Sequence, residues 1–358
     1  MSVFILNGIG IKGVSCAVPS NKIDMTEYYG QFGKDNVDSV IKMTGVKSAY
    51  RTPEEQTASD LCFVAARNLL QEKCIPPEEI GALVFVSQTP DYRLPATACV
   101  LHKRLGLSKD CMSFDVNLGC SGWVYGINIV GSLMQTSDVD CALLLFGDTS
   151  IKTVSPEDRA AVMLFGEAGS ATLLAKDDNS KIKGVLKTDG EGFKSIIMPS
   201  GAYRNRNGNI ERTKHPDGTV CSDYDGRMNG TDVFSFTISQ VPKLINSFVA
   251  DEGGFEQYDA LVLHQANLYI MQQISRKTKV PMDKIPISID RYGNTSGTSI
   301  PVTLCDAYGD RSNSSLRLLF CGYGIGLSWG VIDATISSDD ILPIVITDEY
   351  YTDGGLDN

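Results

Sequence analysis

Positive charge is scarce in this chain. Its 358 residues include 32 lysines and arginines against 43 aspartates and glutamates, which gives a net charge of −11. This balance argues against a broad nucleic-acid interface, because phosphate backbones are bound by clustered lysine and arginine. Long hydrophobic runs are missing as well, and no apolar stretch approaches the roughly 20 residues that a membrane-spanning helix needs. The sequence therefore predicts neither a nucleic-acid-binding protein nor a membrane protein.

The ten cysteines lack the spacing of a metal or redox site. No two of them form a Cys-x-x-Cys motif, so zinc binding and thioredoxin-type chemistry have no support. Most of them lie within apolar runs, which is typical of buried free thiols in a reducing compartment. The first residues, Met-Ser-Val-Phe-Ile-Leu, have no basic segment of a signal peptide. We therefore expect a cytoplasmic protein and no metal.

What the chain does contain is an alternation of helix-like and strand-like segments. Several strand-like segments are apolar throughout, which predicts strands covered on both faces and an α/β fold in layers. The segments 82–86 and 143–147 resemble 260–264 and 318–322, about half a chain length later. This repetition suggests an internal duplication, although buried strands of any α/β protein look alike. If the halves are related, catalytic groups from both could meet at their junction.

The tripeptide Gly119-Cys120-Ser121 stands where a strand-like segment gives way to a helix-like one. The first N–H groups of a helix are unpaired and carry partial positive charge. A cysteine at such a place is predicted to have a lowered pKa and to act as a nucleophile near neutral pH. Gly119 and Gly122 would leave room beside it for a substrate carbonyl. A small cysteine that packs a strand–helix turn is the simpler interpretation.

Two polar residues and a glycine-rich turn farther along the chain could complete a site. His264, one of three histidines, ends an apolar strand, and ligand sites of α/β proteins commonly form at the carboxyl ends of strands. Asn294 lies in a polar loop that opens a helix, where a plain turn residue is the alternative. The turn around Gly324 and Ile325 could expose backbone N–H groups as an oxyanion hole, although an ordinary hairpin would have the same sequence pattern.

These segments together resemble the β-ketoacyl-acyl carrier protein synthase III family of thiolase-fold enzymes. The matching motifs occur in the family's order from about residue 8 to residue 330: Asn117-Leu118-Gly119-Cys120-Ser121-Gly122, Asp158-Arg159, Phe165-Gly166-Glu167-Ala168-Gly169-Ser170-Ala171, Met228-Asn229-Gly230-Thr231-Asp232-Val233-Phe234, His264-Gln265-Ala266-Asn267 and Gly293-Asn294-Thr295-Ser296. The resemblance implies a thiolase-like α/β fold in which two duplicated halves, residues 1–176 and 177–358, form a layered α-β-α-β-α core. The first half would carry the nucleophile, and the second would carry His and Asn and end in an acidic tail.

The resemblance implies an acyltransferase that performs a decarboxylative Claisen condensation. Cys120 would hold the acyl group, while His264 and Asn294 would stabilise the enolate that forms when a malonyl-acyl carrier protein thioester loses CO₂. Backbone N–H groups of Cys120 and of the Gly324–Ile325 turn would hold the oxyanion of the condensation step. Acyl-CoA or acyl carrier protein thioesters would be the substrates, no cofactor would take part, and the product would serve fatty-acid or specialised-metabolite synthesis.

The family also implies contacts outside the catalytic set. Substrate contacts are implied for four residues: Leu94, Arg159, Asn267 and Tyr269. Leu94 would reach the acyl tunnel of a partner subunit in a homodimer. Arg276 and Lys277 would lie near the tunnel mouth and attract the acidic acyl carrier protein. A solvated helix end, where cations favour the helix dipole, explains these two residues equally well.

Three positions that contact CoA in the family depart from its pattern here. Members that use acyl-CoA usually stack the adenine between a tryptophan and an arginine, and these positions are Ser39 and Met43 here. A further family arginine after the histidine motif is Tyr269. Ser39 and Met43 cannot form a cation–π clamp, so we expect the nucleotide of CoA to bind differently or weakly. A carrier-protein donor or a non-malonyl acceptor becomes an alternative to priming with acetyl-CoA.

Other functions use the same three residue types. Papain-like hydrolases have Cys, His and Asn in the chain order of Cys120, His264 and Asn294. Their oxyanion-hole glutamine before the cysteine and their Cys-Gly-Ser-Cys-Trp signature are absent here, which weakens that alternative. A non-catalytic thiolase-fold scaffold is a third possibility, and the presence of all three residues opposes it. Acyl transfer to a non-malonyl acceptor without condensation remains open.

Overall fold

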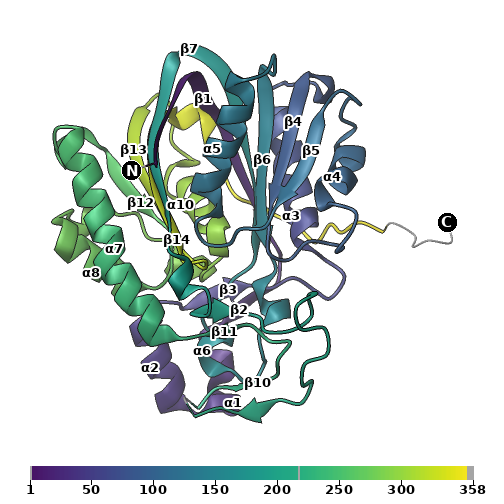
Figure 1. Ribbon diagram of the computed structural model, residues 1–358, viewed down its shortest axis with the longest axis vertical. Helices are drawn as coiled ribbons and strands as arrows, with labels where there is room; N and C mark the ends of the chain where they lie inside the picture. Colours follow the sequence, from purple (N-terminus) through teal and green to yellow (C-terminus); the bar gives the residue numbers. More distant parts are fainter. Residues whose placement is uncertain (1, 217, 353–358) are drawn as a thin grey trace.

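The computed structural model describes residues 2–216 and 218–352. Its main sheet contains β1 Ser2–Val18, β4 Ile80–Val86, β5 Met112–Val116, β6 Cys141–Asp148, β7 Ala168–Thr188, β12 Ala260–Leu263, β13 Ser315–Gly324, β14 Ser328–Ser337 and β15 Val345–Ile346 (Figure 1). Short ribbons join β2 Lys22–Asp24 to β3 Ser48–Tyr50, β8 Ile196–Ile197 to β11 Arg227–Met228, and β9 Thr213–Lys214 to β10 Val220–Cys221. The end of the predicted acidic tail, 353–358, lies outside the described residues.

The helices alternate with these strands along the chain. The α-helices are α1 Tyr29–Phe32, α2 Lys34–Thr44, α3 Ala58–Glu72, α4 Thr97–Leu105, α5 Gly122–Gln135, α6 Arg159–Val162, α7 Gly230–Asp251, α8 Leu268–Thr278, α9 Ile289–Tyr292 and α10 Ser299–Tyr308. A short 3₁₀ helix, η7 Ser296–Thr298, leads into α10. In the residues that the structure describes, no helix has both the length and the apolar character to cross a lipid bilayer.

The sheet is continuous because β1 and β7 are long enough to take part in both halves. These two strands pair antiparallel along most of their length. β7 also pairs with β6 through residues 168–175 and with β14 through residues 183–188. The boundary that the sequence suggested between the halves, after Lys176, therefore falls inside β7, and the two halves share this strand.

The strand order is repeated in the two halves. One part of the sheet contains β4-β6-β7 in this order and the other contains β12-β13-β14, while β5 is an additional strand at the edge of the first part. β4 is parallel to β6 as β12 is to β13, and β6 is antiparallel to β7 as β13 is to β14. The segments that the sequence pattern paired, β4 with β12 and β6 with β13, thus hold equivalent places. The predicted α/β fold with two duplicated halves is confirmed.

The helices form three layers around these strands, as the predicted α-β-α-β-α arrangement requires (Figure 1). α5 and α10 lie between the two parts of the sheet, and most residues of α5 are apolar and buried or half-buried, as expected of a helix in a central layer. α3 and α4 cover the outer face of β4 and β6. α7 and α8 cover β12, β13 and β14 on the opposite side.

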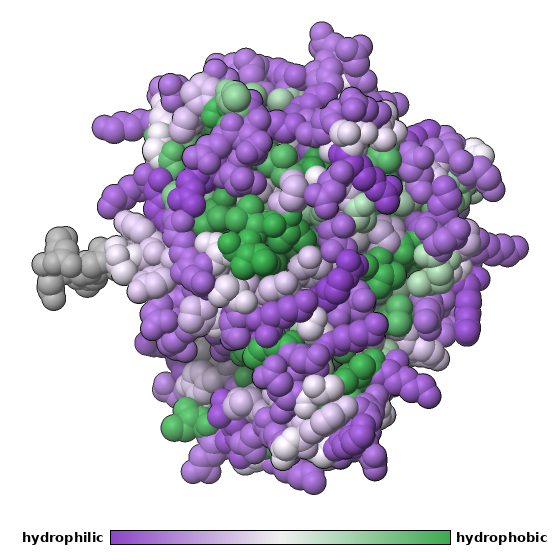
Figure 2. Space-filling view, turned by 180° about the vertical axis from the view of Figure 1, so that it is seen from behind, coloured by the Kyte–Doolittle hydropathy of each residue, from purple (hydrophilic) through white to green (hydrophobic). Residues whose placement is uncertain are grey.

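The central helix layer is where the predicted site residues meet. Cys120 precedes α5, and Asn294 precedes η7 and α10, while His264 follows β12. Each of these residues lies at the end of an element whose other residues are held in the core. The molecular face in Figure 2 is largely hydrophilic, with apolar side chains gathered in separate patches. This surface agrees with the acidic, polar composition of the chain.

Candidate active site

Cys120 lies in the turn between β5 and α5, where the sequence pattern predicts it. Its glycine neighbours are in close contact with protein side chains. A Cβ on Gly119 would lie 2.3 Å from Oε1 of Gln88, and a Cβ on Gly122 would lie 2.4 Å from the ring of Phe146. The two glycines therefore allow the turn to pack tightly against its neighbours. They do not provide the open approach for a substrate carbonyl that we expected from the sequence.

The hairpin between β13 and β14 covers the cysteine. A Cβ on Gly324 would lie 2.8 Å from Sγ of Cys120, so a larger residue would meet the sulfur at this position. The backbone N–H groups of Ile325 and of Cys120 lie near enough to the thiol to oppose the rise in its pKa. The hydroxyls of Ser121 and Ser328, 2.6 Å apart, fasten the turn to the hairpin. Two backbone donors thus lie beside the reactive sulfur, where they are available to the carbonyl oxygen of an acyl group on Cys120.

His264 is buried beside this hairpin, with 1 % of its surface exposed. Its Nδ1 lies 2.7 Å from the Ser299 hydroxyl, and its ring meets the ring of Tyr323 edge-on at 5.3 Å. Burial lowers the pKa of His264 to about 4, and a hydrogen bond to the backbone carbonyl of Ser296 raises it by less. The imidazole is therefore neutral near pH 7, so it can donate a hydrogen bond without carrying charge.

Asn294 is held by its backbone, and its side-chain amide lies beside Ala266, two residues after His264. Its N–H donates to the carbonyl of Leu164, and its carbonyl accepts from the N–H of Gly166. The side-chain Oδ1 accepts from the N–H of Ser296 at 2.9 Å. Nδ2 donates to the carbonyl of Ala266 at 3.4 Å, which is a long and weak hydrogen bond. The amide N–H groups can therefore turn to a substrate oxygen at little cost.

Ser296 joins these groups, although the sequence analysis did not single it out. Its N–H donates to Oδ1 of Asn294 at 2.9 Å, and its carbonyl opposes the lowering of the pKa of His264. Its hydroxyl lies near enough to the Cys120 thiol and the Asp148 carboxyl to oppose the rise in their pKa values. Its φ of 55° is in the left-handed region, which a serine occupies only when its surroundings hold it there. Nothing in the identity of a serine indicates this backbone angle. Its place in the Gly-Asn-Thr-Ser motif is the signal that could have drawn attention to it.

The protonation state of Cys120 differs from the sequence prediction. Burial raises the pKa of its thiol to about 11, and the hydrogen bond from the N–H of Ile325 opposes this effect without overcoming it. The negative charge of Asp148 raises the pKa of the thiol further. The predicted lowering by the helix N-terminus is therefore wrong, because desolvation is the larger effect. The thiol is protonated near pH 7 and must lose its proton when it attacks.

Four of the other predicted residues lie exposed at the surface, outside the buried cluster. Leu94 is 76 % exposed, and Arg159 is exposed at the start of α6. Arg276 and Lys277 are exposed in the last turn of α8. The structure does not bring these side chains together with Cys120, so their predicted roles depend on the substrate or on a second subunit.

The two remaining predicted residues lie at the start of α8. Asn267 is the N-cap of this helix, and its side chain accepts from the N–H of Ile270 at 2.7 Å. Tyr269 is 46 % exposed and stacks on Phe234 with ring centroids 5.7 Å apart. Asn267 thus has a structural function in capping the helix, while Tyr269 presents an aromatic surface to solvent.

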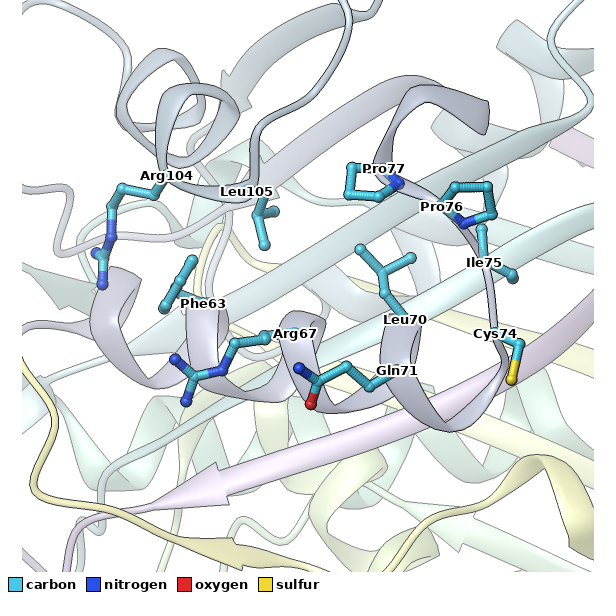
Figure 3. A pocket seen from close by; sticks show the side chains of 10 residues that line it. All are labelled: Phe63, Arg67, Leu70, Gln71, Cys74, Ile75, Pro76, Pro77, Arg104 and Leu105. Atoms are coloured by element: carbon cyan, nitrogen blue, oxygen red, sulfur yellow. The ribbon is translucent and has the colours of Figure 1, made fainter.

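A separate pocket of about 590 Å³ lies between α3 and α4 (Figure 3). Its lining is largely apolar, and its two cations already have partners, since Arg67 pairs with Glu349 and Arg104 with Asp60. It contains none of the residues that converge around Cys120. We therefore place the candidate active site at the junction of the two halves and not in this pocket.

The fold has two duplicated halves, and their junction brings a cysteine of one half to a histidine and an asparagine of the other. This arrangement defines a thiolase-like condensing enzyme. The model of the 3-oxoacyl-[acyl-carrier-protein] synthase III family matches residues 114–190, and the model of its C-terminal part matches residues 233–335. The chain belongs to this family. The Clostridium perfringens β-ketoacyl-[acyl-carrier-protein] synthase III is 30 % identical over 322 residues, which cover 89 % of this chain and 96 % of the relative.

Solved structures support the same assignment. A 3-oxoacyl-(acyl-carrier protein) synthase from Burkholderia xenovorans LB400 superposes with a TM-score of 0.91 at 34 % identity, covering 96 % of this chain and 99 % of that one. The synthase III from Thermus thermophilus gives a TM-score of 0.80 at 27 % identity, covering 92 % of this chain and 99 % of that one. The family resemblance and the thiolase-like fold that the sequence suggested are both confirmed.

Proposed function

We propose that this protein joins an acyl group, held on Cys120, to the two-carbon unit of a malonyl-acyl carrier protein thioester. The observation that carries the proposal is the convergence of three features on one point between α5 and α10. These are a thiol that faces two backbone N–H groups, a neutral His264 and the amide of Asn294. A neutral pair of hydrogen-bond donors suits an enolate oxygen, and a thiol with backbone donors suits acyl transfer.

In the acylation half-reaction, the sulfur of Cys120 attacks the carbonyl carbon of an acyl thioester. The new C–S bond forms as the thiol loses its proton, and the departing carrier thiolate takes up a proton. The oxyanion that develops on the carbonyl oxygen is stabilised by the N–H groups of Cys120 and Ile325. No cofactor takes part in this proposal, because the thioester supplies both the acyl group and the leaving group.

In the condensation half-reaction, the malonyl thioester loses CO₂ and its thioester oxygen becomes an enolate oxygen. His264 and Asn294 donate hydrogen bonds to this oxygen, and the enolate carbon attacks the acyl carbonyl on Cys120. Collapse of the resulting oxyanion releases the β-ketoacyl thioester and the Cys120 thiolate, which takes up one proton. This chemistry serves fatty-acid synthesis or the initiation of a specialised metabolite.

The test is an ordered reaction with purified protein. Incubation with acyl thioesters should add one acyl group to Cys120, and later addition of malonyl-acyl carrier protein should release CO₂ and the β-ketoacyl thioester. If the acyl group leaves only with other nucleophiles and no CO₂ appears, the protein transfers acyl groups without condensation. Release of the free acid would instead support the hydrolase alternative.

We propose that an acyl carrier protein, in preference to CoA, donates the acyl group. Ser39 and Met43 replace the aromatic and cationic residues that clamp the adenine of CoA in the family, and both are exposed on α2. Tyr269, the third departure, lies on α8, which contacts α2. In the acylation panel, acyl-carrier substrates should therefore acylate Cys120 faster than acyl-CoA of the same chain length. Equal or faster acylation by acyl-CoA would contradict this proposal.

The exposed cations of α8 provide a docking surface for the carrier protein. Arg276 and Lys277 form no ion pair with any residue that the structure describes, so they remain available to an acidic partner. The double substitution Arg276→Glu and Lys277→Glu should lower kcat/KM for carrier-bound substrate about 10-fold and reduce its salt dependence. Short free thioester mimics should react as with the wild type.

A matched control reverses two exposed lysines elsewhere, Lys109→Glu and Lys181→Glu, which changes the net charge by the same amount. This variant should keep its activity with the carrier. If it lost as much activity as the Arg276 and Lys277 variant, the overall charge would be responsible. If the Arg276 and Lys277 variant lost the same activity with carrier-bound and with free substrates, these residues would stabilise the end of α8 and would not dock the carrier protein.

We also propose that the protein is a homodimer that pairs through β5. This strand lies at the edge of the main sheet, and β4 is its partner among the described strands. An isologous contact between two edge strands is a common way to satisfy their backbone groups. Leu94, 76 % exposed, would then reach toward the partner's acyl site. Light scattering at micromolar concentration should give twice the chain mass of 38.8 kDa, and a monomer would contradict the proposal.

A cytoplasmic location remains a prediction. All ten cysteines lie in the described part of the chain and are free thiols there, which fits a reducing compartment. Cell fractionation with an antibody to the protein would check this location, and recovery in a membrane or secreted fraction would contradict it.

A further inference from the structure

Arg51 is a buried arginine that no step of the proposed reaction uses. It follows β3, and only 5 % of its surface is exposed. It forms no ion pair with any residue that the structure describes. Its guanidinium group instead donates to two backbone carbonyls, from Nη2 to Val162 at 2.6 Å and from Nη1 to Phe165. A buried charge is usually paired with an opposite charge, so these two bonds need an explanation.

Both carbonyls belong to segment 162–166, which connects the end of α6 to β7 and also holds the backbone of Asn294. The carbonyl of Leu164 accepts from the N–H of Asn294 at 2.8 Å. The N–H of Gly166 donates to the carbonyl of Asn294 at 3.0 Å. The segment therefore binds Arg51 through two of its carbonyls, and it binds Asn294 through a third carbonyl and an N–H group.

Close packing leaves this connection little freedom. A Cβ on Gly166 would lie 1.8 Å from the carbonyl oxygen of Tyr292, and a Cβ on Gly293 would lie 2.9 Å from the carbonyl oxygen of Leu164. The two backbones thus approach each other more closely than side chains would allow. Protein interiors packed in this way transmit displacements, so a shift of one backbone is passed on to the other.

The strand β3, which ends one residue before Arg51, contacts α9 as well. Oγ of Ser48 donates to the carbonyl of Arg291 at 3.1 Å, and the rings of Tyr50 and Tyr292 stack with their centroids 5.5 Å apart. α9 leads directly into the loop that carries the proposed enolate donor. The end of β3 therefore holds this loop twice, by its own contacts with α9 and through the segment that Arg51 binds.

We propose that Arg51 is a positioning residue for the side-chain amide of Asn294. Nδ2 of this amide bonds only weakly to Ala266, at 3.4 Å, and Oδ1 accepts from the N–H of Ser296 in the same loop. The place of the amide therefore depends on the backbone of the loop, which Arg51 fixes through segment 162–166. The proposal rests on the proposed function, in which Asn294 donates to the enolate oxygen.

The first test compares the two half-reactions in Arg51→Met, whose side chain is long but cannot donate. Acylation of Cys120 should stay close to that of the wild type, because the turn of Cys120 is not part of segment 162–166. Condensation should slow by about 10-fold or more, since misplacing a reacting group by roughly 1 Å can cost on the order of 10² in rate. Single-turnover measurements report the two steps separately. Equal loss of both half-reactions would overturn the proposal.

A double variant separates positioning from a general loss of stability. Arg51→Met combined with Asn294→Ala should condense as fast as Asn294→Ala alone, because no amide is left to be positioned. Residues that act independently would instead give losses that multiply. If the double variant were slower than Asn294→Ala by the whole factor that Arg51→Met causes in the wild type, Arg51 would not act through Asn294.

Arg51→Lys keeps the proposal testable if the methionine variant does not fold. Lysine keeps the positive charge but offers one nitrogen in place of two. This variant should fold and should slow condensation by less than Arg51→Met does, again with acylation close to that of the wild type. A lysine variant that slowed acylation as much as condensation would contradict the proposal.

Hydrogen exchange tests the connection without any substrate. In Arg51→Met, the N–H groups of Asn294 and Gly166 should exchange with deuterium faster than in the wild type, because their partners are no longer fixed. The N–H groups of the central helix α5 should exchange as before. Mass spectrometry of peptides that contain these residues measures both effects. Unchanged exchange at Asn294 and Gly166 would overturn the proposal.

Two other cations provide matched controls. Lys152 donates from Nζ to two backbone carbonyls, at 2.7 Å and 2.8 Å, as Arg51 does. Arg104 has a side chain that is 5 % exposed, and it pairs with Asp60. Neither Lys152→Met nor Arg104→Met should slow condensation relative to acylation, although Arg104→Met should lower the Tm because it leaves a buried carboxylate unpaired. A control that changed the ratio of the two rates as Arg51→Met does would contradict the proposal.

These measurements distinguish failure of the positioning from failure of the proposed function. If the wild type is acylated but releases no CO₂ from malonyl-acyl carrier protein, the proposed function is wrong, and hydrogen exchange still tests the connection between Arg51 and Asn294. If the wild type condenses as proposed and Arg51→Met keeps the same ratio of the two rates, the positioning is wrong and the function stands.

Discussion

The Cys120→Ala variant is expected to form no acyl-enzyme and to lose condensation by a factor on the order of 10⁶, the scale for removing a catalytic nucleophile. The backbone N–H groups of Cys120 and Ile325 lie beside the Cys120 sulfur, so an acyl group on a distant residue would lack them. Intact-protein mass spectrometry after incubation with acyl-carrier substrates measures the first effect. Release of the β-ketoacyl product measures the second.

The same variant should keep its fold and part of its chemistry. Alanine removes one sulfur atom from a turn that the glycines and the β13–β14 hairpin hold in place, so the Tm should change little. Decarboxylation of malonyl-acyl carrier protein should continue, because His264 and Asn294 are untouched. Cys99→Ala, which removes an exposed thiol on α4, is the matched control and should acylate normally. An acyl group found on another residue of Cys120→Ala would refute the assignment.

Replacement of Asn294 is expected to separate the two half-reactions. Asn294→Ala should leave acylation of Cys120 largely intact and slow condensation by about 10² or more, the scale for losing one oxyanion donor. The reason is that its Nδ2 bonds only weakly, at 3.4 Å, to the carbonyl of Ala266, and so is available to the enolate oxygen. Single-turnover measurements of acylation and of product release report the two steps separately.

Two further variants make this result specific. Asn294→Asp keeps the oxygen that accepts from the N–H of Ser296 but cannot donate, and it should lose condensation as the alanine variant does. Thr295→Val is the control from the same loop, because the buried Oγ1 of Thr295 has no partner among the described residues. It should be close to the wild type. Equal loss of both half-reactions in the Asn294 variants would contradict a role confined to the enolate.

The fold could be predicted from the sequence because its buried strands have no alternation. A strand covered by helices on both faces is apolar throughout, so β4, β6, β12 and β13 could be recognised and their repetition detected. The boundary between the halves was harder to predict, since β7 pairs with strands of both halves and contains no break at Lys176. A long strand shared by two repeats has no signal in composition.

The three proposed catalytic residues could be predicted because each stands at the end of an apolar segment. His264 follows a buried strand, and Cys120 and Asn294 precede buried helices. A polar side chain in such a place lies at the edge of the apolar core, where a site can form. The roles of the predicted residues outside the buried cluster were harder to predict. Leu94 and Arg159 are exposed in the single chain, so their environment depends on partners that local sequence does not describe.

By itself, the sequence determined the layered fold, its duplication and the residues that meet between the halves, because periodicity and polarity along the chain act locally. Only the tertiary structure decided the protonation states in the site. Desolvation by surrounding elements raises the pKa of Cys120 to about 11 and lowers that of His264 to about 4. It also decided that the end of β6, with the buried Asp148, packs against η7. Burial and contacts between distant segments are properties of the packed molecule, so no local pattern could show them.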